Sequence, residues 1–523
     1  MAARVASAAE AMAWERATIE SGTPATELMN RAGIRAADEI ATRLPGRAAR
    51  GVVVMTGPGN NGGDGWVIAR SLAEKQIPVR VVEVSPARTG DAISARATAS
   101  RTGVPTDELV SNPIREAVVV DALLGTGSSG APKGRISEGV RAINRAANDG
   151  ATVVAVDLPT GLDATTGAHN ECVNAHMSIA FGTVKRGHLI SRDMCGAIIA
   201  VDIGFLENTA ESGLPLLIDA EWVRSRIPAI SFDAHKGTRR SVAIIGGAKG
   251  MAGAAILAGE GALRAGAGLL RLVVDPVSAL AVHAGIPAAI VNEWPEDADS
   301  LSSLLTSVDA IAIGPGLGRS EKTRHLVERL LLAWSGPVVL DADALNVFEG
   351  DVKSLSTLIG GRNALITPHA AEAARLMGVP VTEVLADRFD MCANMARILG
   401  ASVLLKGTPT VAASAGGARF VSATGSAALA TGGSGDVLTG IAVTLMAQMT
   451  ARRSSDHPSR ESSSDVAAAA GVCASFTHGR AAELCGTVRG TTLDDVLRAL
   501  PAAWAEPIRS RRDGILTELG AVA

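Results

Sequence analysis

Apolar runs alternate with polar, glycine-containing segments along most of this chain of 523 residues. Four runs stand out in the first part, "GVVVMTG", "VRVVEV", "EAVVVDALLG" and "ATVVAVDLPTG", and stretches with helical periodicity separate them. The runs are continuously apolar rather than alternating, which is typical of parallel strands that are covered on both faces. The pattern therefore predicts an α/β protein built on parallel sheets.

A polar, proline-containing segment between Leu214 and Asp233 interrupts this rhythm. A second series of apolar runs follows it: "SVAIIGG", "GLLRLVVD", "DAIAIGPG", "GPVVLDAD", "NALITPH", "ASVLLKGT", "TPTVAAS" and "ARFVSAT". The length suffices for two or three domains, and we predict two, over residues 1–215 and 216–523. The serine-rich stretch 451–465 is predicted to be a disordered loop between two helices, because its composition cannot support a packed core.

Composition and charge narrow the possible functions. The net charge of -4 provides no basic field, and the scarce aromatics, without any tyrosine, leave little for stacking on nucleic-acid bases. The five cysteines are scattered without a CxxC pair, which disfavours zinc and is typical of free thiols. No apolar run approaches the roughly 20 residues that span a bilayer. We expect a soluble cytoplasmic protein with small-molecule substrates and neither nucleic-acid nor membrane partners.

The segment "GPGNNGGDG", Gly57 to Gly65, follows the first apolar run and precedes a predicted helix, "WVIARSLAEKQ". Glycines there let the backbone approach a phosphate, and a helix N-terminus offers N–H groups. The spacing matches neither GxGxxG nor GxxxxGK[ST], so neither of these phosphate-binding loops is present. Asn60 and Asn61 add carbonyl oxygens that suit an alkali or alkaline-earth cation. Asp64 is either a cap of the following helix or a functional group.

Two other predicted strands of the first series end in an acid. Asp121 ends the run in "AVVVDALLGTGSSG", and Asp157 ends the run in "VVAVDLPTGLD", with Thr160 beyond it. Because the carboxyl ends of parallel strands lie at one edge of the sheet, we expect these turns to converge on a ligand site.

In this order, "ATELMNRAG", "GPGNNGGDGWVIAR", "DALLGTG" and "VDLPTGLD" resemble the epimerase domain of NAD(P)H-hydrate repair enzymes. The resemblance covers the first domain and implies a Rossmann-like three-layer αβα fold that binds hydrated NADH or NADPH. It also implies a potassium ion held by Asn61, Asp121 and Thr160. The hydrate would contact Asn60, Asn61, Gly62, Gly63, Asp64, Gly125, Thr126, Gly127, Ser128, Ser129, Gly130, Ala131 and Asp157.

The chemistry of such a hydrate suggests a catalytic group. Its hydroxyl sits on the carbon beside the ring nitrogen, whose lone pair can expel the hydroxyl as water when an acid assists. Water then returns to the other face, and one carboxyl can carry the proton in both directions. We assign this role to Asp157. Some relatives carry a lysine after the glycine turn, but the turn that precedes Lys133 differs in length, so Lys133 receives no role.

A different signature marks the C-terminal half. "ATGSAALATGGSGDVLTGIAVTL" is a glycine-rich turn that runs into an apolar helix, and a helix N-terminus there can stabilise a phosphate oxyanion. Asp436 lies in the first turn of that helix. An acid at this position is often only a favourable partner of the helix dipole. Beside an anion-binding turn, however, it suits a base that deprotonates an attacking hydroxyl.

Together with "GPGLG", "LDADALN", "TPHAAE" and "LLKGT", this signature resembles the dehydratase domain of the same repair system, from about His235 to about Pro501. The resemblance implies a ribokinase-like fold, magnesium, ADP as co-substrate and a homo-oligomer. Arg240 stands where the family usually has glycine, so that strand edge is expected to pack differently. The hydrate would contact Ala254, Gly316, His369 and Asp436, and ADP would contact Lys406, Gly407, Thr408, Pro409, Thr410 and Gly435.

The leading prediction is a bifunctional enzyme that equilibrates the R and S hydrates and dehydrates the S form with ADP, giving NAD(P)H, AMP and phosphate. One alternative is a ribokinase-like kinase for a sugar or vitamin precursor with a binding-only first domain, because a fold alone does not settle the substrate. Another is a non-enzymatic first domain that binds protein or RNA. The intact GNNGGDG segment and Asp157 speak against the first alternative, and the retained acids Asp64, Asp121 and Asp157 speak against the second.

Overall fold

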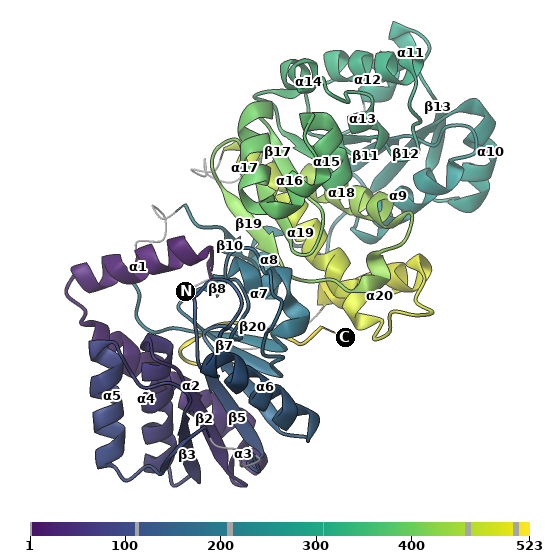
Figure 1. The fold of residues 1–523 in the computed structure, drawn as a ribbon. Helices are drawn as coiled ribbons and strands as arrows, with labels where there is room; N and C mark the ends of the chain where they lie inside the picture. The colour runs from purple at the N-terminus through teal and green to yellow at the C-terminus, as the bar shows by residue number, and fades with distance from the viewer. Residues whose placement is uncertain are drawn as a thin grey trace. The chain divides into compact units, whose positions relative to one another are not determined.

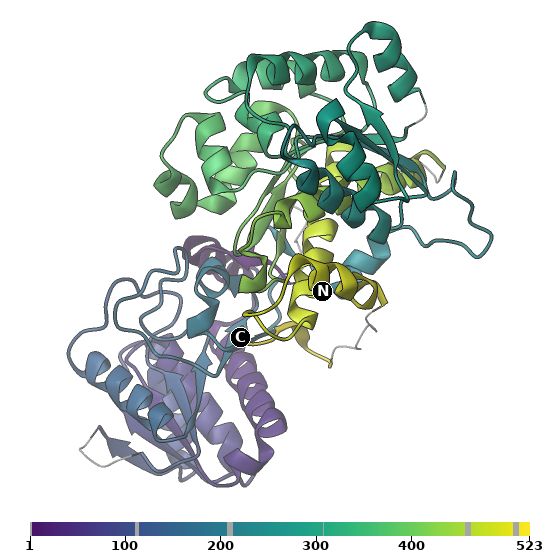
Figure 2. The same cartoon turned by 90° about the vertical axis from the view of Figure 1, so that its right-hand side faces the viewer.

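The computed structural model describes residues 3–109, 114–206, 213–306, 308–455, 462–505 and 512–522. The chain forms two compact units, which are visible in Figure 1 and in the turned view of Figure 2. Unit 1 comprises Met1–Leu216 and Arg509–Ala523, and unit 2 comprises Leu217–Ile508. No helix in the described residues combines the length and apolar character needed to cross a membrane.

Unit 1 is built on an eight-stranded sheet in the order β20-β9-β7-β6-β5-β2-β3-β4, with a separate parallel pair, β1-β8. All neighbours in the large sheet run parallel except β20 and β9. Its strands are β2 (Val52–Thr56), β3 (Val79–Glu83), β4 (Thr106–Glu108), β5 (Val118–Ala122), β6 (Thr152–Val156), β7 (Met177–Phe181), β9 (Ala197–Val201) and β20 (Ile515–Leu519), and the pair is β1 (Val5–Ala6) and β8 (Val184–Lys185).

Helices cover both faces of this sheet (Figure 1). Val52 and Val54 of β2 pack into one core with side chains of α2 and α4, whereas Val53 and Met55 pack into another with α6. Since successive side chains of a strand point to opposite faces, the unit has three layers. The helices are α1 (Ala8–Glu20), α2 (Ala25–Arg43), α3 (Pro45–Ala48), α4 (Asn60–Glu74), α5 (Gly90–Arg101), α6 (Arg135–Asn148) and α7 (Arg186–Ile190).

Unit 2 contains a ten-stranded sheet in the order β10-β19-β18-β17-β16-β15-β14-β11-β12-β13. The strands from β13 to β17 are parallel, and β17, β18 and β19 pair antiparallel. They are β10 (Leu216–Leu217), β11 (Ser241–Ile245), β12 (Leu269–Val274), β13 (Ile290–Glu293), β14 (Ala310–Ile313), β15 (Val338–Leu340), β16 (Ala364–Ile366), β17 (Ser402–Leu405), β18 (Thr410–Ala413) and β19 (Arg419–Ser422).

Two long helices line this sheet. α18 (Ser434–Ser455) packs against β11, β14 and β15, and α19 (Ser463–Leu484) continues along β16 to β19. The other helices are α8 (Ala220–Arg226), α9 (Ala252–Arg264), α10 (Pro276–Gly285), α11 (Ala298–Leu305), α12 (Glu321–Ala333), α13 (Asp343–Asn346), α14 (Val352–Ile359), α15 (Ala370–Met377), α16 (Val381–Ala386), α17 (Arg388–Leu399) and α20 (Leu493–Ala505).

The parallel α/β class predicted for both halves is confirmed, and every apolar run quoted from the sequence contains a strand. Two details differ from the prediction. Residues 512–522, which we placed in the second domain, pack with unit 1, because β20 pairs with β9. The loop predicted over 451–465 is shorter, since α18 extends to Ser455 and α19 begins at Ser463; residues 456–461 lie outside the described residues.

Candidate functional sites

The glycine-rich segment of unit 1 is mostly helix rather than loop. α4 begins at Asn60, so the turn after β2 is only Gly57 to Gly59, and our prediction of a longer turn was wrong. The reason is close packing: a Cβ on Gly62 would lie 2.0 Å from the carbonyl oxygen of Gly57, and one on Gly65 would lie 2.7 Å from Cβ of Ala122. These glycines bring α4 against the ends of β2 and β5.

Asp64 is not a helix cap. It lies in the second turn of α4, while Gly59 occupies the cap position. Its carboxyl lines a cavity, and no hydrogen bond to that carboxyl is recorded among the described residues. Burial raises the pKa of Asp64 well above its usual range, and the charges of Asp157 and Glu15 raise it further.

Asp121 and Thr160 are joined at the end of β5. The carboxylate of Asp121 is fully buried and accepts hydrogen bonds from Thr160 Oγ1 at 2.7 Å, from the Thr160 amide at 2.8 Å and from the Leu123 amide at 3.2 Å. Burial raises the pKa of Asp121 to about 6, and the hydrogen bonds from Thr160 oppose part of that rise. No recorded ion pair of the described residues includes Asp121, so no basic side chain compensates its charge.

Asp157 follows β6 with φ of 63°, a left-handed conformation that is uncommon for a residue with a Cβ. Its Oδ2 accepts hydrogen bonds from Thr126 Oγ1 at 2.6 Å and from the Thr126 amide at 3.1 Å, and its Oδ1 lies 2.5 Å from Lys185 Nζ. Burial alone would raise the pKa of Asp157, but the charge and hydrogen bond of Lys185, together with Thr126, lower it to about 2. This setting suits a fixed anion better than a proton carrier.

A cavity of about 430 Å³ is lined by Asp64 and Asp157, whereas Asp121 and Thr160 are not part of its lining. Asn61 also lines the cavity, and both polar atoms of its side chain are buried without a hydrogen-bond partner among the described residues. A Cβ on Gly125 would lie 3.1 Å from Asn61 Oδ1 and 3.2 Å from Asp157 Oδ2, so the two side chains meet at this glycine. Apolar side chains complete the wall, among them Leu28, Met29, Phe181 and Phe205. A cavity of this size and mixed lining is typical of small-molecule sites.

Not all residues predicted to contact the hydrate line this cavity. Those that do are Asn60, Asn61, Asp64, Gly125, Thr126, Gly127, Ser128 and Asp157. Gly62 and Gly63 are buried in the packing of α4, and Ser129, Gly130 and Ala131 lie outside the lining. Sequence reasoning missed Lys185 and Glu15, which also line it. Lys185 follows the apolar run "MSIAF" of β7 and could have been found as a further polar strand end.

In unit 2, an ion-pair cluster lies at the carboxyl ends of β15, β16 and β17. Lys406 Nζ is 2.7 Å from Asp341 Oδ1 and 3.7 Å from Glu372 Oε2, and Thr439 Oγ1 donates to Asp341 Oδ2 at 2.6 Å. Burial alone would lower the pKa of Lys406, but Asp341 and Glu372 raise it. Lys406, predicted to hold nucleotide, thus already has two anionic partners, and sequence reasoning gave Asp341 and Glu372 no role.

Asp436 lies beside this cluster in the first turn of α18. A Cβ on Gly435 would lie 3.4 Å from Lys406 Nζ, and one on Gly433 would lie 3.9 Å from Asp436 Oδ2. Burial raises the pKa of Asp436 to about 7; Asp341 adds to the rise, whereas Lys406 opposes it. A carboxyl with a pKa near neutrality is suited to take a proton at physiological pH.

The remaining predicted residues of unit 2 lie in neighbouring turns. A Cβ on Gly316 would lie 2.9 Å from Cβ of Ala254, so these two residues meet. His369 caps α15 by accepting from the Ala371 amide at 3.1 Å, and its Nε2 is 3.4 Å from Glu372 Oε1. Residues 407–410 connect β17 to β18 through a cis Thr408–Pro409 bond, and Thr410 begins β18. Among the described residues, no three His, Cys, Asp or Glu side chains are arranged as a metal site.

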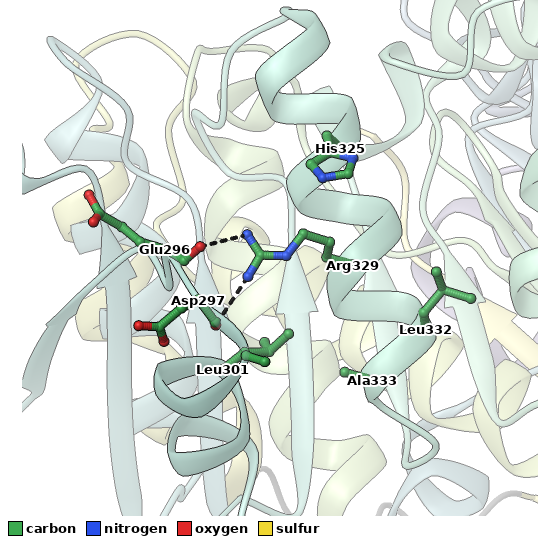
Figure 3. Close-up of a pocket in the computed structure, with 8 residues that line it drawn as sticks. Glu296, Asp297, Leu301, His325, Arg329, Leu332 and Ala333 are labelled. Carbon is green, nitrogen blue, oxygen red and sulfur yellow. Dashed lines mark hydrogen bonds between the residues drawn. The ribbon is translucent and has the colours of Figure 1, made fainter.

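Another hollow of unit 2, of about 640 Å³, lies between α11 and α12 (Figure 3). Its charged groups include Glu296, His325 and Arg329, and Arg329 donates to the backbone carbonyl oxygens of Glu296 at 3.2 Å and Asp297 at 3.1 Å. None of the predicted site residues lines this hollow. The guanidinium of Arg329 forms its hydrogen bonds with the backbone at the start of α11.

Comparison with known proteins agrees with the division of the chain into two units. Residues 25–187 match the family described as YjeF-related protein N-terminus, and residues 242–501 match the family described as NAD(P)H-hydrate dehydratase. The two folds and their sites therefore define a two-domain α/β enzyme with a kinase-like second unit. Over 460 residues the chain is 35% identical to the bifunctional NAD(P)H-hydrate repair enzyme Nnr of Moorella thermoacetica, covering 83% of this chain and 86% of that protein. The chain belongs to the family of bifunctional NAD(P)H-hydrate repair enzymes.

Two further similarities concern the whole chain and unit 2. The Escherichia coli repair enzyme Nnr is 35% identical over 433 residues, which are 81% of each chain. The crystal structure of an ADP/ATP-dependent NAD(P)H-hydrate dehydratase from Bacillus subtilis, co-crystallised with ATP and Mg²⁺, is 30% identical, with a TM-score of 0.44; it covers 55% of this chain and 96% of its own.

Proposed function

We propose that unit 1 epimerises the R and S hydrates of NADH or NADPH, and that unit 2 dehydrates the S hydrate at the expense of ADP. The observation that carries the proposal is that the chain has two acid-bearing sites at the carboxyl ends of parallel strands, one at Asp157 and one at Asp436. Ligands of open α/β sheets bind at this edge. Joining both activities in one chain lets the whole R and S mixture be repaired.

In unit 1, the residues that we propose to hold a potassium ion fit that role. Within the described parts of the chain, Asn61 offers a buried amide oxygen without a partner and Asp121 a buried carboxylate without a basic partner, and Thr160 adds a hydroxyl oxygen. Oxygen ligands of this kind suit hard cations. A bound potassium ion would supply a fixed positive charge for anionic groups of the substrate. The remaining lining, Asn60 and the Gly125–Ser128 turn, would position the hydrate beside Asp157.

In unit 2, we assign Asp436 as the base. It accepts the proton of the hydrate hydroxyl while that oxygen attacks the terminal phosphorus of ADP, and AMP leaves. The phosphorylated hydrate then loses phosphate from one ring carbon and a proton from the next, which restores NAD(P)H. The N-terminus of α18 at Gly433 and Gly435 suits the phosphate charge. Magnesium would be held mainly by the nucleotide phosphates, since it commonly uses only one or two protein carboxylates.

The remaining predicted site residues of unit 2 keep their proposed contacts. Ala254, Gly316 and His369 would contact the hydrate, and Lys406 to Thr410 would contact ADP. We also propose a cytoplasmic enzyme, supported by five free cysteines of which four are buried. Assembly into a homo-oligomer stays a prediction.

Incubation of the full chain with a mixture of R and S hydrates, ADP and Mg²⁺ tests the proposal. We expect the near-ultraviolet absorbance of reduced nicotinamide to recover completely, because epimerisation feeds the R form into dehydration. Recovery limited to the S fraction would show that unit 1 is not an epimerase. The alternative, a small-molecule kinase, predicts that no absorbance recovers and that the chain phosphorylates a sugar or vitamin precursor to a stable product. Parallel reactions with ADP and ATP identify the phosphoryl donor.

A further inference from the structure

Asp64 differs from Asp157 in having no recorded hydrogen-bond partner among the described residues, a property that it shares with Glu15. It faces the cavity from the interior of α4, so it does not cap the helix. Packing of Gly62 and Gly65 against the ends of the strands fixes α4, and a carboxyl on such a rigid element is held in a defined position. Neither capping nor an ion pair accounts for an acid at this place.

Asp157, in contrast, already accepts three hydrogen bonds, one of them from a charged ammonium group. Lys185 occupies Oδ1 at 2.5 Å, and the hydroxyl and amide of Thr126 both donate to Oδ2. Lys185 is itself held by the carbonyl oxygens of Phe181 at 3.1 Å and Thr183 at 3.2 Å. Protonation of Asp157 would remove its charge and leave the buried ammonium of Lys185 without its counter-charge.

We propose that Asp64, in its carboxylic acid form, is the proton donor and acceptor of epimerisation, and that the Asp157–Lys185 pair is a fixed charged group beside it. The inference rests on the epimerase function proposed above. Asp64 gives its proton to the hydroxyl on the carbon beside the ring nitrogen. The C–O bond breaks, water leaves, and the nitrogen lone pair forms the C=N bond of a planar iminium cation.

Return of water completes the exchange. A water molecule adds to the other face of the cation, its C–O bond forms, the C=N electrons return to nitrogen, and the proton of that water passes to the Asp64 carboxylate. For the same acid to serve both faces, the ring must turn about its bond to the ribose between the two steps. No atom or electron is consumed, and the carboxylate left on Asp64 is the counter-charge of the cation in between.

The charges around the cavity favour this division of roles. Its ionisable lining groups are Glu15, Asp64, Asp157 and Lys185. Lys185 compensates Asp157, so ionisation of Asp64 would add an uncompensated negative charge near Asp157 and Glu15. Burial and these charges hold the pKa of Asp64 well above its usual range, which keeps the acid protonated and able to donate.

The test compares Asp64→Asn, Asp64→Glu and Glu15→Gln in the full chain. Glu15 is the acid to compare with Asp64, because it lines the same cavity from α1. The readouts are the rate of R-to-S interconversion and the exchange of hydrate oxygen with isotopically labelled water, which reports C–O cleavage. Dehydration of pure S hydrate by the same preparation shows that unit 2 is intact, and circular dichroism compares the folding of each variant.

We expect Asp64→Asn to slow interconversion and oxygen exchange about 10²- to 10⁴-fold, the usual contribution of a general acid. Asp64→Glu should recover part of both rates, which a merely structural role of Asp64 would not produce, and Glu15→Gln should slow both rates far less than Asp64→Asn. Oxygen exchange in Asp64→Asn at the wild-type rate, or failure of Glu15→Gln instead, would overturn the inference. If Asp64→Asn is misfolded, an Asp64→Glu variant that folds without any interconversion would count against it equally. Absence of interconversion in the unchanged chain would instead refute the epimerase function itself.

Discussion

At the scale of single residues, environment rather than residue type separates the acids of this protein. Asp157 and Asp436 both follow an apolar run or a glycine turn, yet one is held ionised by Lys185 and the other is pushed towards its neutral form by burial and Asp341. The sequence signals both acids as functional candidates. It contains no local signal of their opposite electrostatics, because Lys185 and Asp341 are distant in the chain.

Asp436 makes dehydration pH-dependent. Because a base must be ionised, kcat/KM for S hydrate should rise with pH up to about 7 and level off above it. The stability of the fold depends on pH in the opposite direction. Because the folded state binds the proton of Asp436 more tightly than the unfolded chain does, the contribution of this residue to the free energy of unfolding is lost as the pH rises through about 7. Initial rates with ADP at saturating Mg²⁺ measure the profile.

The Asp436→Asn variant is the companion measurement. We expect its kcat to fall by about 10²-fold or more and the rise with pH to disappear. Asp351→Asn is a suitable control, since Asp351 caps α14 and pairs with Arg324 at 2.6 Å, away from the described cluster. If Asp436→Asn kept the wild-type dependence of kcat/KM on pH, Asp436 would not be the base.

Arg240 departs from the family pattern, which usually has glycine here, and the structure accommodates its side chain. It adopts φ of 73°, the left-handed conformation that explains why glycine is common at this position. Its guanidinium lies 3.5 Å from the carboxylate of Asp309, while the Ser241 amide donates to the other oxygen of that carboxylate at 2.7 Å. The pairing at the start of β11 is retained in spite of the larger side chain.

At the scale of elements, two helices of unit 2 meet through glycine. A Cβ on Gly440 of α18 would lie 1.8 Å from the carbonyl oxygen of Ala258, and one on Gly261 of α9 would lie 2.3 Å from that of Val437. α9, which is rich in small residues, packs against β11 and β12. It also packs against α18, the helix that carries Asp436, and so helps to position the base.

Gly440→Ala should therefore destabilise unit 2. Backbone blocks the added methyl group, so the two helices must separate, at a cost of about 1–3 kcal/mol in the free energy of unfolding. Thermal unfolding followed by circular dichroism measures the effect. Gly253→Ala is the matched control in α9, because a Cβ there meets nothing within 4 Å and alanine favours the helix. Equal melting temperatures for both variants would contradict the packing argument.

At the scale of the whole molecule, unit 1 is made from both ends of the chain. β20 pairs antiparallel with β9 and covers what would otherwise be an open sheet edge. Its segment is also tied by ion pairs, from Arg512 to Glu39 at 2.6 Å and from Glu518 to Arg43 at 2.5 Å. The C-terminal strand therefore belongs to the epimerase unit, although it follows the dehydratase unit in sequence.

Deletion of residues 509–523 should affect the two activities unequally. We expect epimerisation to be lost at a lower temperature than in the full chain, because β9 becomes an exposed edge and Glu39 loses a partner. Dehydration of S hydrate should persist to the same temperature as before. Residual activities after heating measure both, and removal of only residues 521–523, which follow β20, is the control. Equal losses of the two activities would contradict the assignment of this segment.

The sequence by itself determined the parallel α/β class, most strands and the acids at their ends, because continuous apolar runs and the residues that follow them are local features. Only the tertiary structure decided which groups meet. Lys185 reaches Asp157 across 28 positions, Asp341 reaches Lys406 across 65, and β20 returns to the first sheet. Burial and pairing, which set whether a carboxyl carries a charge or a proton, are properties of these long-range contacts, and no local pattern encodes them.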